Sequence, residues 1–199
     1  MSMDEKRIKS QLAFLTEADK MKNVFRRTLI TDGSRRENDA EHSWHLALMA
    51  MVLKEYALPD GVDIDRVIRM CLVHDLVEIY AGDTFCYDKQ GAQDKEQREQ
   101  DAADKLFAML PDEQGAEYRA LWEEFDAMET PDAKYAAAAD RLQPLLNNYI
   151  NKGNTWREGN ATSADVYARM AMVKDGMPQL WPVVEYIVED AIAQGFLER

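Results

Sequence analysis

The residues of this sequence that could do chemistry are histidines and the acidic residues close to them. His42 lies in the stretch EHSWH, and His74 is followed at once by Asp75 in the stretch VHDLVEIYAGDT. Glu78 comes four residues after His74, and a Gly-Asp-Thr turn containing Asp83 closes the second stretch. Imidazole and carboxylate groups in such combinations bind divalent metals and transfer protons.

The apolar spacing predicts that two of the histidines point into the protein. Both share a helical face with apolar residues, namely Leu46, Met49 and Leu53 for His42, and Val67, Met70 and Cys71 for His74. On a helix, Asp75 is rotated by about 100° from His74, so both side chains can reach one point beside the helix. Asp140 ends the run KYAAAAD, whose small side chains allow close approach by another element.

Buried carboxylates without partners are costly, so a metal between two imidazoles and two carboxylates explains His42, His74, Asp75 and Asp140 economically. Such a ligand set suits one divalent ion and does not select among Mn, Co, Fe, Zn and Ni. In the alternative interpretation, each polar residue is satisfied separately within a helical core. Pro144 lies four residues after Asp140 and cannot donate a backbone hydrogen bond to the Asp140 carbonyl oxygen. We therefore expect the helix to bend there. The bend either aims Asp140 at the site or only lets the helix follow the core.

The net charge of −13 argues against a nucleic-acid polymer or an anionic membrane as the partner. A small anionic substrate would need a local positive feature. The stretches VFRRT and GSRRE supply one through the pairs Arg26–Arg27 and Arg35–Arg36, unless these arginines only pair with surface acids.

The length of 199 residues fits one domain, and no apolar run approaches the ~20 residues that span a bilayer. The first residues, MSMDEKRIKS, lack the apolar core of a signal peptide. The two cysteines suit a reducing compartment, with Cys71 in the core and Cys86 as a free thiol. We therefore expect a cytoplasmic protein.

Three- and four-residue apolar spacing predicts an all-α bundle of about six to eight helices. Thr130 and Pro131 form a strong start signal, as a cap and a first helical residue, while Asp63 and Ser163 are expected as further caps. The segments 26–39 and 152–162 are expected as loops, and 58–63 as a turn. The helices are expected at about residues 4–14 (extending to 20), 40–56, 63–80, 94–109, 113–128, 130–151, 163–175 and 178–194.

Taken together, EHSWH, HDLVEIYAGD and a downstream helical Asp resemble the HD-domain superfamily of metal-dependent phosphohydrolases. FRRT before RRENDAEHS is similar to the branch of the 5′-deoxynucleotidases and HD-domain-containing protein 2. The resemblance covers residues 12–149. It implies a single HD domain over residues 1–199, with a compact multi-helix bundle and C-terminal helices at 163–194 that pack on the motif-bearing core.

By this resemblance, His42, His74, Asp75 and Asp140 hold one divalent metal, Mg included among the candidates. The resemblance also implies roles for residues around the metal. Glu78 is a catalytic residue that orients or deprotonates water or protonates the leaving group, and Asp83 shares that role or binds a sugar hydroxyl. Substrate-binding residues are Arg27, with Arg26 as the adjacent alternative, and Thr84. The tryptophan that follows the arginine in the bacterial nucleotidases is replaced here by Thr28.

Three residues of EHSWH have secondary expectations. Glu41 is expected to partner a ligand imidazole, His45 to lie behind the ligands or face substrate, and Trp44 to lie in the core or at a dimer contact. Three histidines are too few for a dinuclear site of this kind.

The expected function is hydrolysis of (deoxy)nucleoside 5′-monophosphates to nucleoside and phosphate, by a homodimer in nucleotide metabolism. The alternatives are a hydrolase of nucleoside triphosphates or other small phosphoesters, and a non-catalytic module that binds nucleotides.

Overall fold

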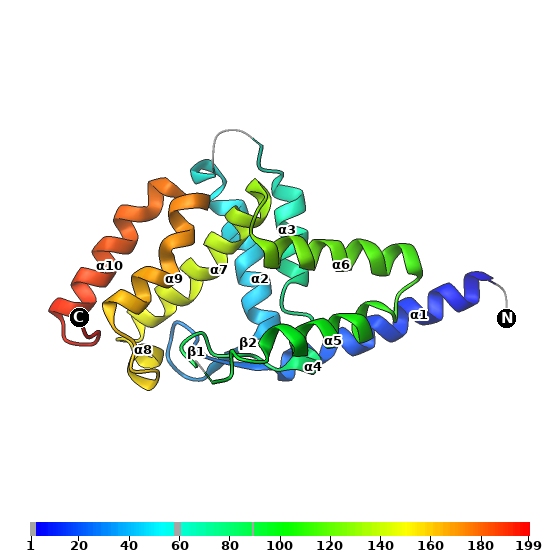
Figure 1. Ribbon diagram of the computed structural model, residues 1–199, viewed down its shortest axis with the longest axis horizontal. Coiled ribbons are helices and arrows are strands. Elements are labelled where there is room, and N and C mark those ends of the chain that lie inside the picture. Colours follow the sequence, from blue (N-terminus) through cyan, green and yellow to red (C-terminus); the bar gives the residue numbers. More distant parts are fainter. Residues whose placement is uncertain (1–2, 58–60, 89) are drawn as a thin grey trace.

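A computed structural model describes residues 3–57, 61–88 and 90–199, and most of them are helical (Figure 1). The helices are α1 (Met3–Ala18), α2 (Asp39–Val52), α3 (Ile64–Val73), α4 (Glu78–Ala81), α5 (Lys95–Phe107), α6 (Asp112–Ala127), α7 (Pro131–Ile150), α8 (Asn154–Glu158), α9 (Ser163–Gly176) and α10 (Trp181–Ala193). Eight of these described helices have ten or more residues, which confirms the all-α prediction. Short 3₁₀ segments lie at Asp19–Asn23, Lys54–Tyr56 and Pro178–Leu180. The predicted turn at 58–63 lies partly outside the described residues.

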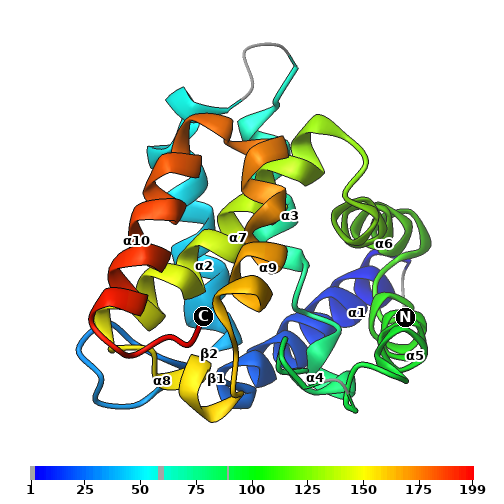
Figure 2. The same cartoon turned by 60° about the vertical axis from the view of Figure 1, so that its left-hand side comes forward.

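Helix α7 is the central element, and α2, α3, α6 and α9 all pack against it (Figure 2). Its alanine run, residues 136–139, is completely buried. Close approach of α9 also depends on Gly176, because a Cβ there would lie 2.4 Å from the Lys134 carbonyl oxygen and 2.7 Å from the Ala138 Cβ. The helix continues through Pro144 without interruption.

The predicted loop at 26–39 is wrong in part, because it overlaps an antiparallel hairpin of β1 (Phe25–Leu29) and β2 (Arg36–Asn38). Gly33 takes a positive φ of 72° in the connection, a conformation that glycine adopts without a Cβ clash. Asp32 accepts a hydrogen bond from the Ser34 amide at 2.8 Å. The Asp-Gly turn signal is therefore present, but charged residues follow it instead of an apolar alternation.

The helix starts follow the predicted caps with one exception. The Thr130 hydroxyl accepts from the Ala133 amide at 3.1 Å, with Pro131 in the first turn, and Asp63 caps α3. Ser163 was expected as the cap of α9, but Thr162 takes this position in a capping box. The predicted loop at 152–162 also contains α8. None of the described helices is long and apolar enough to cross a membrane.

Candidate metal centre and catalytic site

His42 enters the core from the first turn of α2, whose start is fixed by a capping box. The Asn38 side chain accepts a hydrogen bond from the Glu41 amide at 3.0 Å, and the Glu41 carboxylate accepts one from the Asn38 amide. Arg35 donates two bonds of 2.7 Å to the same carboxylate. The prediction that Glu41 partners a ligand imidazole is therefore wrong.

Gln143 and Glu37 take the place expected for Glu41. The Gln143 Oε1 lies 3.2 Å from His42 Nδ1, and the Glu37 carboxylate lies 3.7 Å from the same nitrogen. Gln143 in turn donates to Glu37 at 2.6 Å and lies 3.3 Å from His45 Nδ1. His45 thus sits behind the ligands. Trp44 is 63% exposed, so its expected place in the core is wrong.

His74 stands at the end of α3, and the predicted continuous helix from 63 to 80 is wrong. Helix α3 ends at Val73, and α4 begins at Glu78. In the turn between them, the Leu76 and Glu78 amides bond to carbonyls three residues earlier, which is the tighter 3₁₀ pattern. Apolar periodicity cannot distinguish this turn from a continuous helix.

The four expected metal ligands converge in the core, and all four are buried. Asp140 Oδ1 lies 3.0 Å from His42 Nε2 and 3.8 Å from His74 Nε2. Asp75 Oδ1 lies 3.1 Å from His74 Nε2, and its other oxygen lies 3.9 Å from His42 Nε2. The ligand atoms of His42, His74 and Asp140 are close enough to hold one metal ion.

The orientation of the imidazoles fits a metal. His74 Nδ1 lies 2.9 Å from the Cys71 carbonyl oxygen, so this nitrogen carries the proton in the neutral ring and Nε2 presents a lone pair. Within the described residues, His74 Nε2 is buried without a hydrogen-bond partner. A lone pair facing carboxylate oxygens needs a cation between them, and a divalent ion held by His42, His74, Asp75 and Asp140 would supply it.

When no metal is bound, protonated imidazoles can pair with the carboxylates of Asp75 and Asp140. Burial opposes the charged form of His74, but Asp75 and Asp140 outweigh it and raise its pKa to about 10. Burial opposes ionisation of Asp140, but His42 and His74 hold its pKa well below the usual value. A metal would therefore displace protons from the imidazoles.

We expect metal-free protein to lose stability as the pH rises from 7 to 10. A raised folded-state pKa stabilises the fold fully below the unfolded value near 6.5, and that contribution is lost as pH rises through about 10. The melting temperature of chelator-treated protein should fall by at least about 3 °C over this range. Calorimetry would measure the melting temperature at each pH. The fall should be smaller in His74→Gln, because glutamine does not carry the imidazole proton. An equal fall in the variant would contradict the assignment.

A second acidic cluster adjoins the ligands and consists of Asp39, Glu78 and Asp83. Burial raises the pKa of Glu78 well above its usual value, and Asp75, Asp39 and Asp83 add to the shift. Burial together with Asp75 raises the pKa of Asp39 to about 7. At least one proton is therefore retained in this cluster near neutral pH. The sequence motif contains no signal for Asp39, which reads as an ordinary acid at a helix start.

Arg26, rather than Arg27, reaches the acidic groups. Its side chain is 11% exposed, and its guanidinium lies 2.9 Å from Asp75 and 3.7 Å from Asp39. Arg27 is exposed and lies over the Phe85 ring, with 4.8 Å between guanidinium carbon and ring centroid. Thr84 lines the cleft beside the ligands, and its hydroxyl accepts from Arg98 at 3.0 Å.

The segment that carries Asp83 depends on Arg98 of α5. Besides Thr84, the Arg98 guanidinium donates to the carbonyl oxygens of Ala81 at 2.5 Å and Gly91 at 2.9 Å. These three bonds fix both ends of the segment between α4 and α5.

We expect Arg98→Met to lower kcat/KM by about tenfold without loss of metal, because charged hydrogen bonds of ordinary strength would be removed from the segment that positions Asp83. Steady-state kinetics and metal analysis would check it. Arg69→Met is the matched control, since Arg69 makes an exposed ion pair with Glu117 whose loss costs little. Unchanged kinetics in Arg98→Met would contradict the positioning role.

The chain belongs to the HD domain family. The family model described as HD domain matches residues 18–181. A crystal structure of a predicted metal-dependent phosphohydrolase from Magnetospirillum magnetotacticum MS-1 is 48% identical and superimposes with a TM-score of 0.95, covering 100% of this chain and 99% of that one. Human 5′-deoxynucleotidase HDDC2 is 31% identical over 139 residues, 69% of this chain.

The extent of these similarities differs among the proteins compared. The match to the human protein spans 66% of that protein's length. A conserved hypothetical protein from Pyrococcus furiosus, 21% identical with a TM-score of 0.57, covers 92% of this chain and 99% of that one and shares the fold. The fold and the family are therefore those of the HD domain.

Proposed function

We propose that this protein hydrolyses deoxynucleoside 5′-monophosphates to nucleoside and phosphate with one divalent metal. The observation that carries the proposal is the buried His42–His74–Asp140 cluster, in which His74 Nε2 lacks a partner among the described residues. Support for the substrate comes from the similarity to human 5′-deoxynucleotidase HDDC2. The expected cytoplasmic location and homodimer remain predictions.

A bound divalent ion supplies polarisation of the phosphoryl group and a more acidic water. Glu78 then acts as the proton donor, because its raised pKa keeps a proton available inside a buried site. Water adds to phosphorus, the P–O ester bond breaks, and the leaving alkoxide takes the Glu78 proton. The proton released by the water restores the Glu78 carboxyl group.

Arg26 and Asp83 prepare the site around this step. Arg26 offsets the charge of Asp75 and Asp39, so that a phosphate dianion can enter a site rich in carboxylates. Asp83 faces the same cleft as Glu78. It shares the proton with Glu78 or accepts a hydrogen bond from a sugar hydroxyl.

A phosphate-release screen tests the function. Chelator-treated protein is supplied separately with Mn, Co, Fe, Zn, Ni or Mg and offered ribo- and deoxynucleoside mono- and triphosphates. We expect inorganic phosphate from deoxynucleoside monophosphates. Tripolyphosphate from triphosphates would establish the alternative hydrolase, and binding of nucleotide without any product would establish a non-catalytic module.

A further inference from the structure

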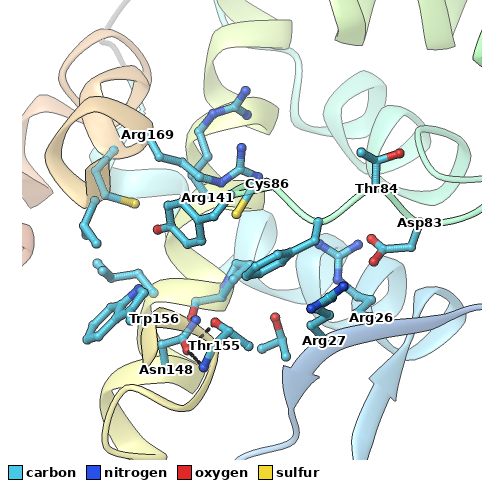
Figure 3. Close-up of a pocket in the computed structure, with 17 residues that line it drawn as sticks. Arg26, Arg27, Asp83, Thr84, Cys86, Arg141, Asn148, Thr155, Trp156 and Arg169 are labelled. Atoms are coloured by element: carbon cyan, nitrogen blue, oxygen red, sulfur yellow. Dashed lines mark hydrogen bonds between the residues drawn. The ribbon is translucent and has the colours of Figure 1, made fainter. Parts of the chain in front are cut away.

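Four arginines line a small cavity beside the metal centre (Figure 3). Arg26 and Arg27 come from β1, Arg141 from α7 and Arg169 from α9. Asp83 is the one carboxylate residue among the described residues that line it. The cavity volume is about 60 Å³. Since one water needs at least about 10–15 Å³, this space suits a few waters or one small anion.

Arg141 is held in place by a backbone carbonyl group and by one long ion pair with Asp140. Its side chain is 15% exposed, and it donates to the Ala137 carbonyl oxygen at 2.9 Å. The closest carboxylate oxygen, on Asp140, lies 3.4 Å away, and Asp140 already faces His42 and His74. Arg141 therefore has charge to offer to a further anion.

Arg169 makes no hydrogen bond and no ion pair with the described parts of the chain, although it is half-buried. Asp165, one turn earlier on α9, accepts from the amide and hydroxyl of Thr162 in the capping box. Its carboxylate is thus engaged at the helix start. Arg141 and Arg169 line the same cavity.

Placing like charges together in a half-buried cavity is unfavourable unless an anion joins them. The chain has a net charge of −13, so carboxylates for simple surface pairing are abundant. Guanidinium groups bind phosphate through paired, charge-assisted hydrogen bonds. The chemistry of this cavity therefore fits a phosphate group.

The cavity and the cleft of the metal centre share several of their lining residues. Arg26, Asp83, Thr84, Arg141 and Arg169 line both. The metal-centre cleft has a volume of about 280 Å³. A single ligand can thus place one group at the metal ligands and another among the arginines.

We propose that the four-arginine cavity binds a second phosphate group of the substrate, so that the preferred substrates are nucleotides carrying phosphates at two positions. This inference rests on the proposed function for the reaction at the metal centre, but the anion site itself can be tested without that reaction.

The first experiment titrates inorganic phosphate into chelator-treated full-length protein by calorimetry. We expect one phosphate per chain and at least about tenfold weaker binding in Arg169→Met and in Arg141→Met, as for the loss of charged hydrogen bonds. Arg69→Met, which removes the same charge from an exposed ion pair, should bind within twofold of the wild type. Absence of binding, or equal binding by the Arg169 and Arg141 variants, would overturn the inference.

The second experiment compares a deoxynucleoside 3′,5′-bisphosphate with the matching 5′-monophosphate. We expect kcat/KM to favour the bisphosphate by about tenfold or more, and this ratio to fall by at least tenfold in Arg169→Met. If the substitution left the ratio of the two kcat/KM values unchanged, the arginines would not bind a second phosphate group of the substrate. If phosphate binds at Arg169 but neither nucleotide is hydrolysed, the proposed function fails and the anion site remains.

Discussion

Asp140→Asn should weaken binding of the divalent metal by at least about 100-fold and reduce phosphate release by a similar or larger factor. Asp140 Oδ1 is the atom that approaches both imidazoles, at 3.0 Å from His42 and 3.8 Å from His74. The amide keeps the size of the side chain and removes its charge. Loss of a group that only supports a ligand typically costs 10–100-fold in metal affinity, so loss of a ligand should exceed this range.

The control for this variant is Asp126→Asn. Asp126 lines the same cleft but is exposed, so its replacement makes the same chemical change outside the ligand cluster. Metal affinity, measured by competition with a chromophoric chelator, should be unchanged in the control. Wild-type affinity in Asp140→Asn would contradict the ligand assignment, as would equal losses in both variants.

Glu78→Gln should lower kcat by about 10²- to 10⁴-fold, the usual contribution of a general acid or base, while metal binding stays close to wild type. Glutamine keeps the shape of the side chain but cannot give its proton to the leaving group. In the wild type, kcat should fall as the pH rises through the pKa of Glu78, which burial and Asp75 raise above its usual value. The variant should lose this dependence.

Two further variants test the role of Glu78, one as a control and one through the pKa of its carboxyl group. Glu123→Gln alters an exposed carboxylate paired with Arg119 and should leave kcat unchanged. Asp39→Asn removes a charge that raises the pKa of Glu78, so the alkaline limb of the kcat profile should move to lower pH. If Glu78→Gln kept full activity, Glu78 would not be the proton donor.

The convergence of the four expected ligand residues could be predicted because each lies in a short motif on an apolar helical face. His42, His74, Asp75 and Asp140 meet in the structure as that pattern indicated, although the continuous helix assumed for 63–80 is interrupted after Val73. The interruption escapes prediction because a 3₁₀ turn preserves the three-residue apolar spacing.

The surroundings of the ligands were harder to predict, because polar residues reveal their partners only after packing. Glu41 serves the helix cap, whereas Glu37 and Gln143 support His42 from a strand and from a distant helix. Arg141 and Arg169 are ordinary helix residues in the sequence and line the same cavity through the packing of α7 and α9.

The most direct test of a single-metal phosphohydrolase is a metal titration of chelator-treated protein with phosphate release from a deoxynucleoside 5′-monophosphate as the readout. Activity should be absent without metal, rise in proportion to bound ion and reach its maximum at one equivalent per chain. Full activity in the stripped protein, or a rise that continues to two equivalents, would contradict the mechanism described for this site.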